Sequence, residues 1–562
     1  MGAAISRTDA TSLGPRGRGR KVLWMLLALA TALRLWNLGF GLDLEDPRHA
    51  VRNNVIDERG MVEAELDGIL SGRFHPGDFL YRGSGGFYVL GLADLLWFLP
   101  RGLTHADGWA GALAELRVNP SPLHLVHRFV SALFGVLTVL WTYRLVRREL
   151  GERAALLACF FLAVAYVHVR ESHFGTIDVL WSFLTLATVD ALLRLQRAPG
   201  RAAYLRGALW IGATAATKYF GGLLVLHLGL AHLFARSAAR NAGRPVPGWR
   251  ELLQGSLGVP LGFLLLSSYV VYALPDLIEV VRWSIETYGS TSAGGGPLPR
   301  LGHHVRYTFA VGLGEPVFAL ALIGMGLGLA RPGAPRFLAL SALLLLPTTF
   351  LTAHTPVRFG LAPAILLVPL AALAAERLTA GRPVAVVGLV ALLAGAPSLA
   401  RSLSFDALIG RPDSRVEMVR HLDAQGAGKG EVLAVGFYGL PRLSGDSPEP
   451  FEDLVLRVRS DPGITPAAAR ALAEEAIGRA PRFVLRDETS GMPPDHDALV
   501  WEPIRAVLAR DYDVALHLEG RGDPGSVRLP DPIAGYLSLF VPYDRPWAMT
   551  RPGPTLVLYE RR

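Results

Sequence analysis

Acidic residues gather in a polar stretch at residues 51–90, directly after a long apolar run at 22–40. The stretch begins with the adjacent acids Asp57 and Glu58 and continues with Glu63, Glu65 and Asp67. A carboxylate placed beside a hydroxyl or amine can accept its proton and act as a general base, and two neighbouring acids can share base and positioning roles. We therefore expect the reaction site here. A solvated acidic loop is the simpler alternative.

Three more residues at the ends of apolar runs could do chemistry. Asp178 opens one run, where a carboxylate is costly in a membrane and usually functional, although it could also cap a helix. Lys218 lies between two runs, and its compact ammonium group suits a lipid phosphate, although it could also snorkel to a membrane surface. Arg358 precedes a further run, where it could pair with a phosphate or carboxylate or serve as an interface anchor.

Composition indicates a polytopic membrane protein. The chain has 562 residues, of which 51% are hydrophobic, and its apolar residues occur in blocks about as long as a bilayer is thick. The formal net charge of +8 does not indicate nucleic-acid binding, because nearly all basic residues are arginines between apolar blocks. Cys159 is the only cysteine, which excludes an internal disulfide.

The apolar blocks predict about eleven transmembrane helices, counted with an uncleaved first span. They are residues 22–40, 123–146, 154–170, 177–195, 203–218, 219–235, 253–274, 311–330, 336–352, 359–376 and 383–400. A twelfth block, 84–100, is short and contains Asp94. We expect it to be a juxtamembrane helix on the membrane surface.

Arginine distribution decides the status of this twelfth block. If residues 84–100 do not span, every arginine-dense short loop lies in the cytoplasm, as the positive-inside rule requires. The first loop, 41–122, and the tail from about 401 then lie outside, together with residues 171–176, the hairpin tip at Lys218, the loop 275–310 and the turn 353–358, which ends at Arg358. Asp178 stands at the outer head of its predicted span. The groups with chemical potential thus share one face of the membrane.

Three regions follow from this topology. Residues 1–21 form a cytoplasmic N-terminus, 22–400 a transmembrane module that includes the outer loop 41–122, and 401–562 an extracytoplasmic domain. In the last region we predict short strands at 431–437, 482–487, 514–520 and 555–560 and a helix at 466–480. About 160 residues suffice for one small α/β domain.

The order of these motifs resembles the lipid-dependent sugar transferases of the GT-C fold. Glycosyltransferase family 39, the protein mannosyltransferase-like members, is the most similar, and the aminoarabinose lipid A transferases are also similar. The resemblance covers about residues 20–415 and rests on these features: the pair Asp57-Glu58, Pro76 with Phe79 and Tyr81, His127-Arg128, Ser172-His173, Thr176 with Asp178, Thr217-Lys218-Tyr219, and Arg358-Phe359 with Pro363. This chain departs from the family at Tyr81-Arg82, where a Tyr-Pro or a Pro pair is common.

The resemblance implies a multi-pass plasma (inner) membrane enzyme that uses a polyprenyl-phosphate sugar on the outer face. It would transfer the sugar with inversion to a protein, glycan or lipid acceptor, as in protein glycosylation or cell-envelope assembly. Asp57 would be the base, with Glu58 and Asp178 also catalytic. Lys218, Tyr219 and Arg358 would hold the lipid phosphate, and Tyr81, Arg82 and His173 would shape the site or bind the acceptor.

Neither a metal nor another cofactor is predicted, because the histidines lack metal-ligand spacing beside clustered acids and no Gly-rich phosphate loop follows a strand. A transporter or flippase of lipid-linked sugars is the main alternative. Transporters tend to show internal inverted repeats and midplane charges, and neither is visible here. A polymerase, ligase or assembly protein of the envelope is a third possibility.

Overall fold

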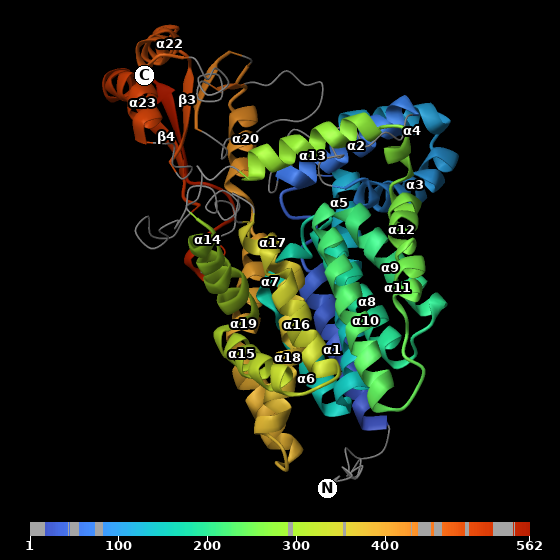
Figure 1. Ribbon diagram of the computed structural model, residues 1–562. Coiled ribbons are helices and arrows are strands. Elements are labelled where there is room, and N and C mark those ends of the chain that lie inside the picture. The colour runs from blue at the N-terminus through green and yellow to red at the C-terminus, as the bar shows by residue number, and fades with distance from the viewer. Residues whose placement is uncertain are drawn as a thin grey trace.

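The computed structural model describes residues 17–42, 44, 56–72, 83–289, 296–351, 356–428, 430–436, 451–453, 464–488, 494–520, 543 and 546–562, to which the structural statements refer. Helices form a bundle, and a small sheet with its own helices lies beyond one end of it, opposite the N-terminus (Figure 1). We call this the sheet end of the bundle.

The bundle consists of α-helices joined by short connecting segments. In chain order these are α1 (Gly17–Leu35), α5 (Ser121–Leu150), α6 (Glu152–Val164), α7 (Tyr166–Glu171), α8 (Asp178–Arg197), α9 (Arg201–Thr217), α10 (Leu224–Asn241), α11 (Trp249–Ser256), α12 (Gly258–Leu266), α14 (Pro297–His303), α15 (Glu315–Ala330), α16 (Ala334–Leu345), α17 (Pro347–Phe350), α18 (Leu361–Leu378) and α19 (Val384–Ile409). Shorter segments connect some of them: η3 (Tyr219–Leu223), η4 (Ser268–Val271), the π-helical η6 (His304–Val311) and η7 (Val357–Gly360).

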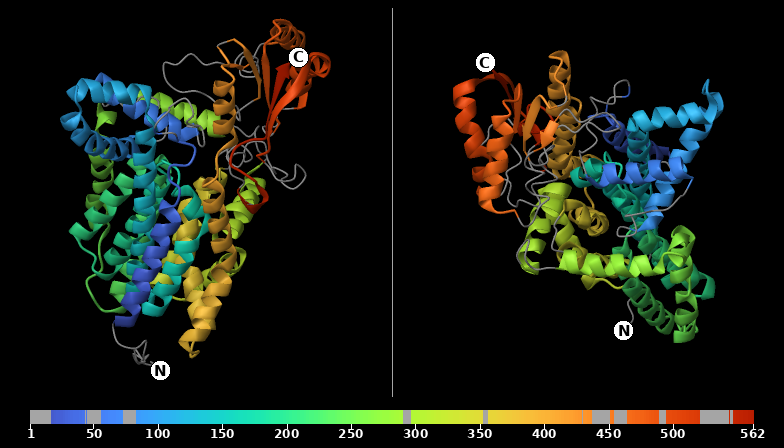
Figure 2. Two further views of the ribbon diagram at one scale, coloured as in Figure 1. Left: turned by 180° about the vertical axis from the view of Figure 1, so that it is seen from behind. Right: turned by 90° about the horizontal axis from the view of Figure 1, so that it is seen from above.

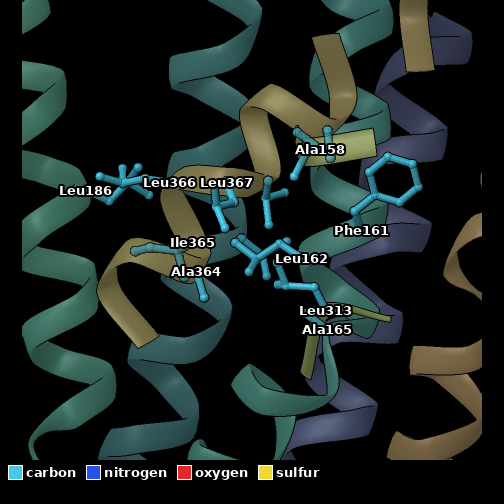
Figure 3. Packing of buried hydrophobic residues seen from close by; sticks show 14 of the residues in the cluster. Ala158, Phe161, Leu162, Ala165, Leu186, Leu313, Ala364, Ile365, Leu366 and Leu367 are labelled. Atoms are coloured by element: carbon cyan, nitrogen blue, oxygen red, sulfur yellow. The ribbon is translucent and has the colours of Figure 1, made fainter. Parts of the chain in front are cut away.

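The core of the bundle surrounds α18. All its residues from Leu361 to Ala375 are buried, because other helices cover it on every side. Figure 3 shows part of this packing, where Leu366 and Leu367 lie among side chains of α6 such as Leu162. Gly324 brings α15 against α18, since a Cβ at this position would collide with the backbone of Leu370.

Only some of these helices are individually long and apolar enough to cross a bilayer. Within the described residues they are Ser121–Leu150, Tyr219–Asn241, Val357–Leu378 and Val384–Ala424, and Pro297–Val311 with Glu315–Ala330 would add a fifth as one span bent by 112°. Each of the eleven predicted ranges contains a helix. Several, such as α6 and α12, are short, so the number of spans stays a prediction.

Four further helices lie at the sheet end: α2 (Ile56–Ser71), α3 (Ser84–Thr104), α4 (Gly108–Val118) and α13 (Leu274–Gly289). Figures 1 and 2 show α3 running across the end of the bundle rather than along it. Its exposed residues Leu92, Leu96 and Leu103 follow a helical repeat, while Asp94 is buried. This amphipathic arrangement agrees with the surface helix predicted at 84–100.

The C-terminal region contains a five-stranded sheet in the order β2-β1-β3-β5-β4. Its strands are β1 (Val432–Val435), β2 (Phe451–Asp453), β3 (Phe483–Asp487), β4 (Tyr512–Leu518) and β5 (Leu556–Arg561). β1 pairs in parallel with β2 and β3, and β5 pairs antiparallel with β3 and β4, placing Asp487 opposite Leu556.

Alternating side chains of the sheet pack against helices on its two faces. Leu433 and Val484 contact α22 (Pro466–Gly478) and α23 (Pro494–Asp511), whereas Val432 and Phe483 contact α20 (Ser414–Ala424). The four predicted strands and the predicted helix match β1, β3, β4, β5 and α22 within a few residues. The sequence did not reveal β2, α20 or α23.

Candidate functional site

Three residues predicted from distant parts of the chain meet at the sheet end of the bundle. Asp178 is the first residue of α8, Lys218 follows α9, and Arg358 lies in η7. The ammonium Nζ of Lys218 donates to Asp178 Oδ1 at 2.6 Å, and Nε of Arg358 lies 3.6 Å from Asp178 Oδ2. One carboxylate thus faces two cations. We call these residues the Asp178 cluster.

Aromatic rings surround the lysine of this cluster. Lys218 Nζ lies 4.3 Å from the ring centre of Phe359 and 5.3 Å from that of Trp181, where the negative faces of the rings can stabilise a cation. Lys218 and Arg358 are largely buried, at 13% and 12% side-chain exposure. Their charges therefore act in a setting of low dielectric constant, where an anion is held more strongly than in water.

The contacts of these three residues differ from those expected of a helix cap, a snorkelling lysine or a lone anchor, and their catalytic and binding roles stay predictions. Asp178 does not cap α8 with its side chain, because Ile177 is the capping position and no side-chain cap bond forms. Lys218 does not simply snorkel, and Arg358 is not a lone anchor, because both face a buried carboxylate.

Glycines bring the start of α3 against the Asp178 cluster. Gly83 has a φ of 109°, which favours glycine, and a Cβ there would lie 2.6 Å from the carbonyl oxygen of Ala216. A Cβ on Gly86 would collide with Ile177, the residue before Asp178. The glycine-rich start of α3 thus packs against the segments that carry Asp178 and Lys218.

A second buried ion pair borders the cluster. Arg170 and Glu171, at the end of α7, form a salt bridge and are both buried. Burial raises the pKa of Glu171, while the positive charges of Arg170 and Arg358 act to lower it and Asp178 acts to raise it. α7, which carries this pair, also packs against η7 and α8, the elements that carry Arg358 and Asp178.

Glu58 is fixed by a third buried pair. Arg128 of α5 donates to its carboxylate through Nε at 2.6 Å and Nη2 at 3.1 Å, and the Gly175 N–H donates to Oε1 at 3.0 Å. Arg128 Nη1 also donates to the carbonyl oxygens of Leu38 and Phe40. These bonds tie the first turn of α2 to α5 and to the segment that leads to Asp178. They occupy Glu58, so its position indicates a structural role.

Asp57, the predicted base, precedes Glu58 in the first turn of α2. Its side chain lies outside the described residues, and so do Tyr81 and Arg82. His173 is buried, with Nδ1 2.9 Å from the Val169 carbonyl oxygen and Nε2 3.0 Å from that of Trp36, the residue after α1. Its Nε2 also lies 3.5 Å from Asp406 Oδ1 in α19, so His173 connects α7 with the end of α1 and with α19. The ring of Tyr219 stacks on Phe263 at 6.5 Å.

Arg128 and Glu171 were not predicted as site residues, although Arg128 belongs to the His127-Arg128 motif. An arginine near the start of an apolar run is a usable signal, because a charge buried in a bundle needs a partner. Its partner, 70 positions earlier in the chain, could not be identified from spacing.

Comparison with known proteins shows a similarity to one family and a shared fold. Residues 122–247, from α5 to beyond α10, match the family model described as dolichyl-phosphate-mannose-protein mannosyltransferase. This segment contains Asp178 and Lys218. No curated protein matches the chain in sequence.

Solved structures resemble the chain over nearly its whole length. An oligosaccharyltransferase from Archaeoglobus fulgidus, in complex with zinc and sulfate, has a TM-score of 0.50 at 13% identity, covering 96% of this chain and 88% of that chain. ArnT from Cupriavidus metallidurans, in the apo state, has a TM-score of 0.50 at 16% identity, covering 87% of this chain and 95% of that chain. At such low identity the likeness establishes the fold alone.

The family match and the fold agree with the resemblance predicted from the motifs. The family match over residues 122–247 supports a glycosyltransferase. The chain has the GT-C fold and, over residues 122–247, is similar to the dolichyl-phosphate-mannose-protein mannosyltransferases.

Proposed function

We propose that the protein is an integral membrane glycosyltransferase that takes its sugar from a polyprenyl-phosphate donor. The acceptor is a protein, glycan or lipid on the outer face of the plasma membrane. The observation that carries this proposal is the Asp178 cluster, where two buried cations face a single carboxylate.

The donor groups of the cluster fit a phosphate diester. Lys218 presents an ammonium group and Arg358 a guanidinium group, and both are largely buried beside the Asp178 carboxylate. A phosphate oxygen is a strong acceptor for ammonium and guanidinium donors.

The proposed reaction is a direct displacement. The Asp57 carboxylate accepts the proton of the acceptor hydroxyl or amine, and the acceptor atom forms a bond to the anomeric carbon on the face opposite the phosphate. The bond between the anomeric carbon and the phosphate oxygen breaks, and its electron pair leaves with the polyprenyl phosphate. Lys218 and Arg358 would stabilise the charge that develops on the leaving phosphate, and the sugar would be inverted.

The position of α2 supports Asp57 as the base. The neighbouring Glu58 is held by Arg128 and by the Gly175 N–H, three residues before Asp178. The backbone of Asp57 is thereby kept near the segment that leads into the cluster. A base must lie close to the proton that it accepts, and a helix start pinned by three charged hydrogen bonds provides such an orientation.

The test uses membranes from cells that express the full chain, supplied with a polyprenyl-phosphate sugar labelled in the sugar. Labelled protein, glycan and lipid fractions are then separated and counted. Asp57→Asn should abolish transfer, and Lys218→Ala should reduce it about tenfold or more through weaker donor binding. Lys21→Ala, an exposed lysine at the opposite end, should leave transfer unchanged.

Full transfer by Asp57→Asn at normal expression would exclude its role as base. Movement of the labelled lipid across reconstituted vesicles, with no new glycosidic bond, would instead favour a flippase.

A further inference from the structure

One aromatic side chain of the C-terminal region is inserted into the helical bundle. Tyr543 is 5% exposed, and its ring centre lies 5.2 Å from that of Tyr166 in α7. A Cβ on Gly312, the residue after η6, would lie 2.6 Å from the Tyr543 hydroxyl oxygen and 2.7 Å from Cβ of Val167. The hydroxyl end of Tyr543 therefore reaches a space beside Gly312 and Val167 that a larger residue at position 312 would fill.

The segment that follows Tyr543 is also attached to the bundle. Met549 is buried in the same apolar core as Tyr543, and Arg411 donates to the carbonyl oxygen of Thr550 at 2.7 Å. The short helix η8 (Pro546–Ala548) lies against α19. In Figure 1 this red segment runs from the bundle to the sheet, where it becomes β5. The C-terminal domain is thus connected to the bundle by a packed contact in addition to the chain through α19.

Tyr543 borders the charged residues beside the candidate site. The Arg170 guanidinium carbon lies 5.4 Å from the centre of the Tyr543 ring and 5.0 Å from that of Phe174. Two rings of different origin thus flank one buried guanidinium group. Attraction between a cation and an aromatic face strengthens when both are removed from water.

Arg170 connects this contact to the Asp178 cluster. It pairs with Glu171, and α7, which carries both residues, packs against η7, which carries Arg358, and against α8, which begins at Asp178. A shift of Arg170 would leave Glu171 without its nearest cation. That carboxylate would then compete for Arg358, one of the two cations assigned to the donor phosphate.

The ring of Tyr543, rather than its hydroxyl group, makes these contacts. The hydroxyl oxygen is buried and has no hydrogen-bond partner among the described residues. Phenylalanine should therefore replace tyrosine here without loss, whereas alanine should remove the contact.

We propose that Tyr543 is a positioning residue through which the C-terminal domain holds the Arg170–Glu171 pair and keeps Arg358 available to the donor phosphate. This role rests on the proposed function for its catalytic meaning, but the contact itself can be tested without substrate.

The first experiment is hydrogen exchange of the purified full-length protein, followed by mass spectrometry of peptides within residues 166–178. Tyr543→Ala should exchange faster in these peptides than the unmodified chain, and Tyr543→Phe should not. Trp547→Ala is the matched control, because Trp547 lies in the same attached segment but is 56% exposed. Unchanged exchange in Tyr543→Ala would overturn the proposal.

The second experiment measures binding of undecaprenyl phosphate to the same four proteins in detergent. Tyr543→Ala should bind about tenfold more weakly, and the other two variants should bind within twofold of the unmodified chain. Faster exchange with unchanged binding would show a merely structural contact and would also overturn the proposal. If the unmodified chain fails to bind, the proposed donor is wrong, and the exchange result alone decides whether Tyr543 positions Arg170.

Discussion

At the residue scale, Asp178 explains why two cations can be kept in a largely apolar environment. A buried cation without a partner is costly, and a single carboxylate can stabilise two neighbouring cations only in part. Lys218 has the closer contact, 2.6 Å, and Arg358 the longer one, 3.6 Å. Of the two cations, Arg358 is therefore the one held less closely by this carboxylate.

Glu58 is the residue for which structure and expected chemistry differ most. Its two oxygens accept from Arg128, and both side chains are fully buried. Replacing Glu58 with Gln leaves the Arg128 guanidinium without its counter-charge, which typically costs about 3–5 kcal/mol. We expect Glu58→Gln to lower the unfolding temperature of the purified protein strongly, as followed by tryptophan fluorescence in detergent.

Two controls accompany this prediction. Glu63→Gln breaks an exposed pair with Arg59 in the same helix and should change stability by less than about 1 kcal/mol. Glu58→Gln combined with Arg128→Met removes both buried charges and should recover part of the loss. Equal unfolding temperatures for Glu58→Gln and Glu63→Gln would show that the buried pair does not hold α2 in place.

At the scale of elements, a second group of buried polar residues lies where α2 meets α3 and α5. Glu65 of α2 is buried near Asp94 of α3, and His127 of α5 lies with Nε2 2.8 Å from Asp94 Oδ2. No side chain among the described residues donates to the Glu65 carboxyl group. Burial, and then the charge of Asp94, raise the pKa of Glu65 to about 10.

This shift predicts how stability depends on pH. A carboxyl group with a raised pKa binds its proton more tightly in the folded state than in the unfolded state, where its ordinary pKa is 4.5. Its contribution to stability is complete below that value and is lost as the pH rises toward about 10. The unfolding temperature of the protein should therefore fall between about pH 6 and pH 9, and that of the Glu65→Gln variant should fall less, because an amide stays neutral.

The comparison needs the unmodified chain and the Glu65→Gln variant in one detergent at each pH, because other groups also titrate in this range. The difference in slope between the two proteins isolates the one carboxyl group. Parallel curves would mean that Glu65 is already ionised at the lower end of this range in the folded protein.

Sequence patterns predicted elements better than the contacts between them. Apolar runs and alternating strands identified the bundle helices and β1, β3, β4 and β5, because both patterns are local. β2 has three residues, too few to show an alternating pattern. α20 and α23 contain many charged residues, so their apolar faces were not recognised in the sequence. The structure shows these faces packed against the sheet.

The sequence indicated which charged residues would be functional, but not which of them would contact each other. A rare lysine and a carboxylate at the ends of apolar runs were both expected to be functional, and they contact each other across 40 positions of the chain. Nothing in their spacing specified that contact, because it follows from the packing of α8 against α9 and from a break in the helix after Thr217. The same reason hid the pairing of Glu58 with Arg128.

At the scale of the whole molecule, chemistry and basic loops lie at opposite ends. The sheet, α2 and α3 lie at the sheet end, opposite the N-terminus (Figures 1 and 2). Glu58 belongs to α2, and the segments that carry Asp178 and Lys218 pack against the start of α3. Contacts among the arginine-dense loops show that these also gather together: Arg197 pairs with Glu149, Arg244 donates to the Arg197 carbonyl oxygen, and Arg153 donates to that of Thr379. This polarity is what the positive-inside rule requires if the sheet end faces outward.

The orientation of the bundle is therefore the last testable prediction. Single cysteines are introduced in a Cys159→Ser background, which removes the only native thiol. Glu63→Cys in α2 and Glu474→Cys in α22 should react in intact cells with a membrane-impermeant maleimide, because both positions are exposed at the sheet end. Arg147→Cys and Arg240→Cys, exposed in the arginine-dense loops, should react only after permeabilisation. Each basic residue near an anionic leaflet contributes about 1 kcal/mol to this orientation, and sixteen arginines in five short loops outweigh the tendency of α3 to insert.

Labelling of position 63 from outside, with position 474 protected, would mean that an odd number of spans separates the two positions. Both the surface position of α3 and the shared face of site and sheet would then be wrong.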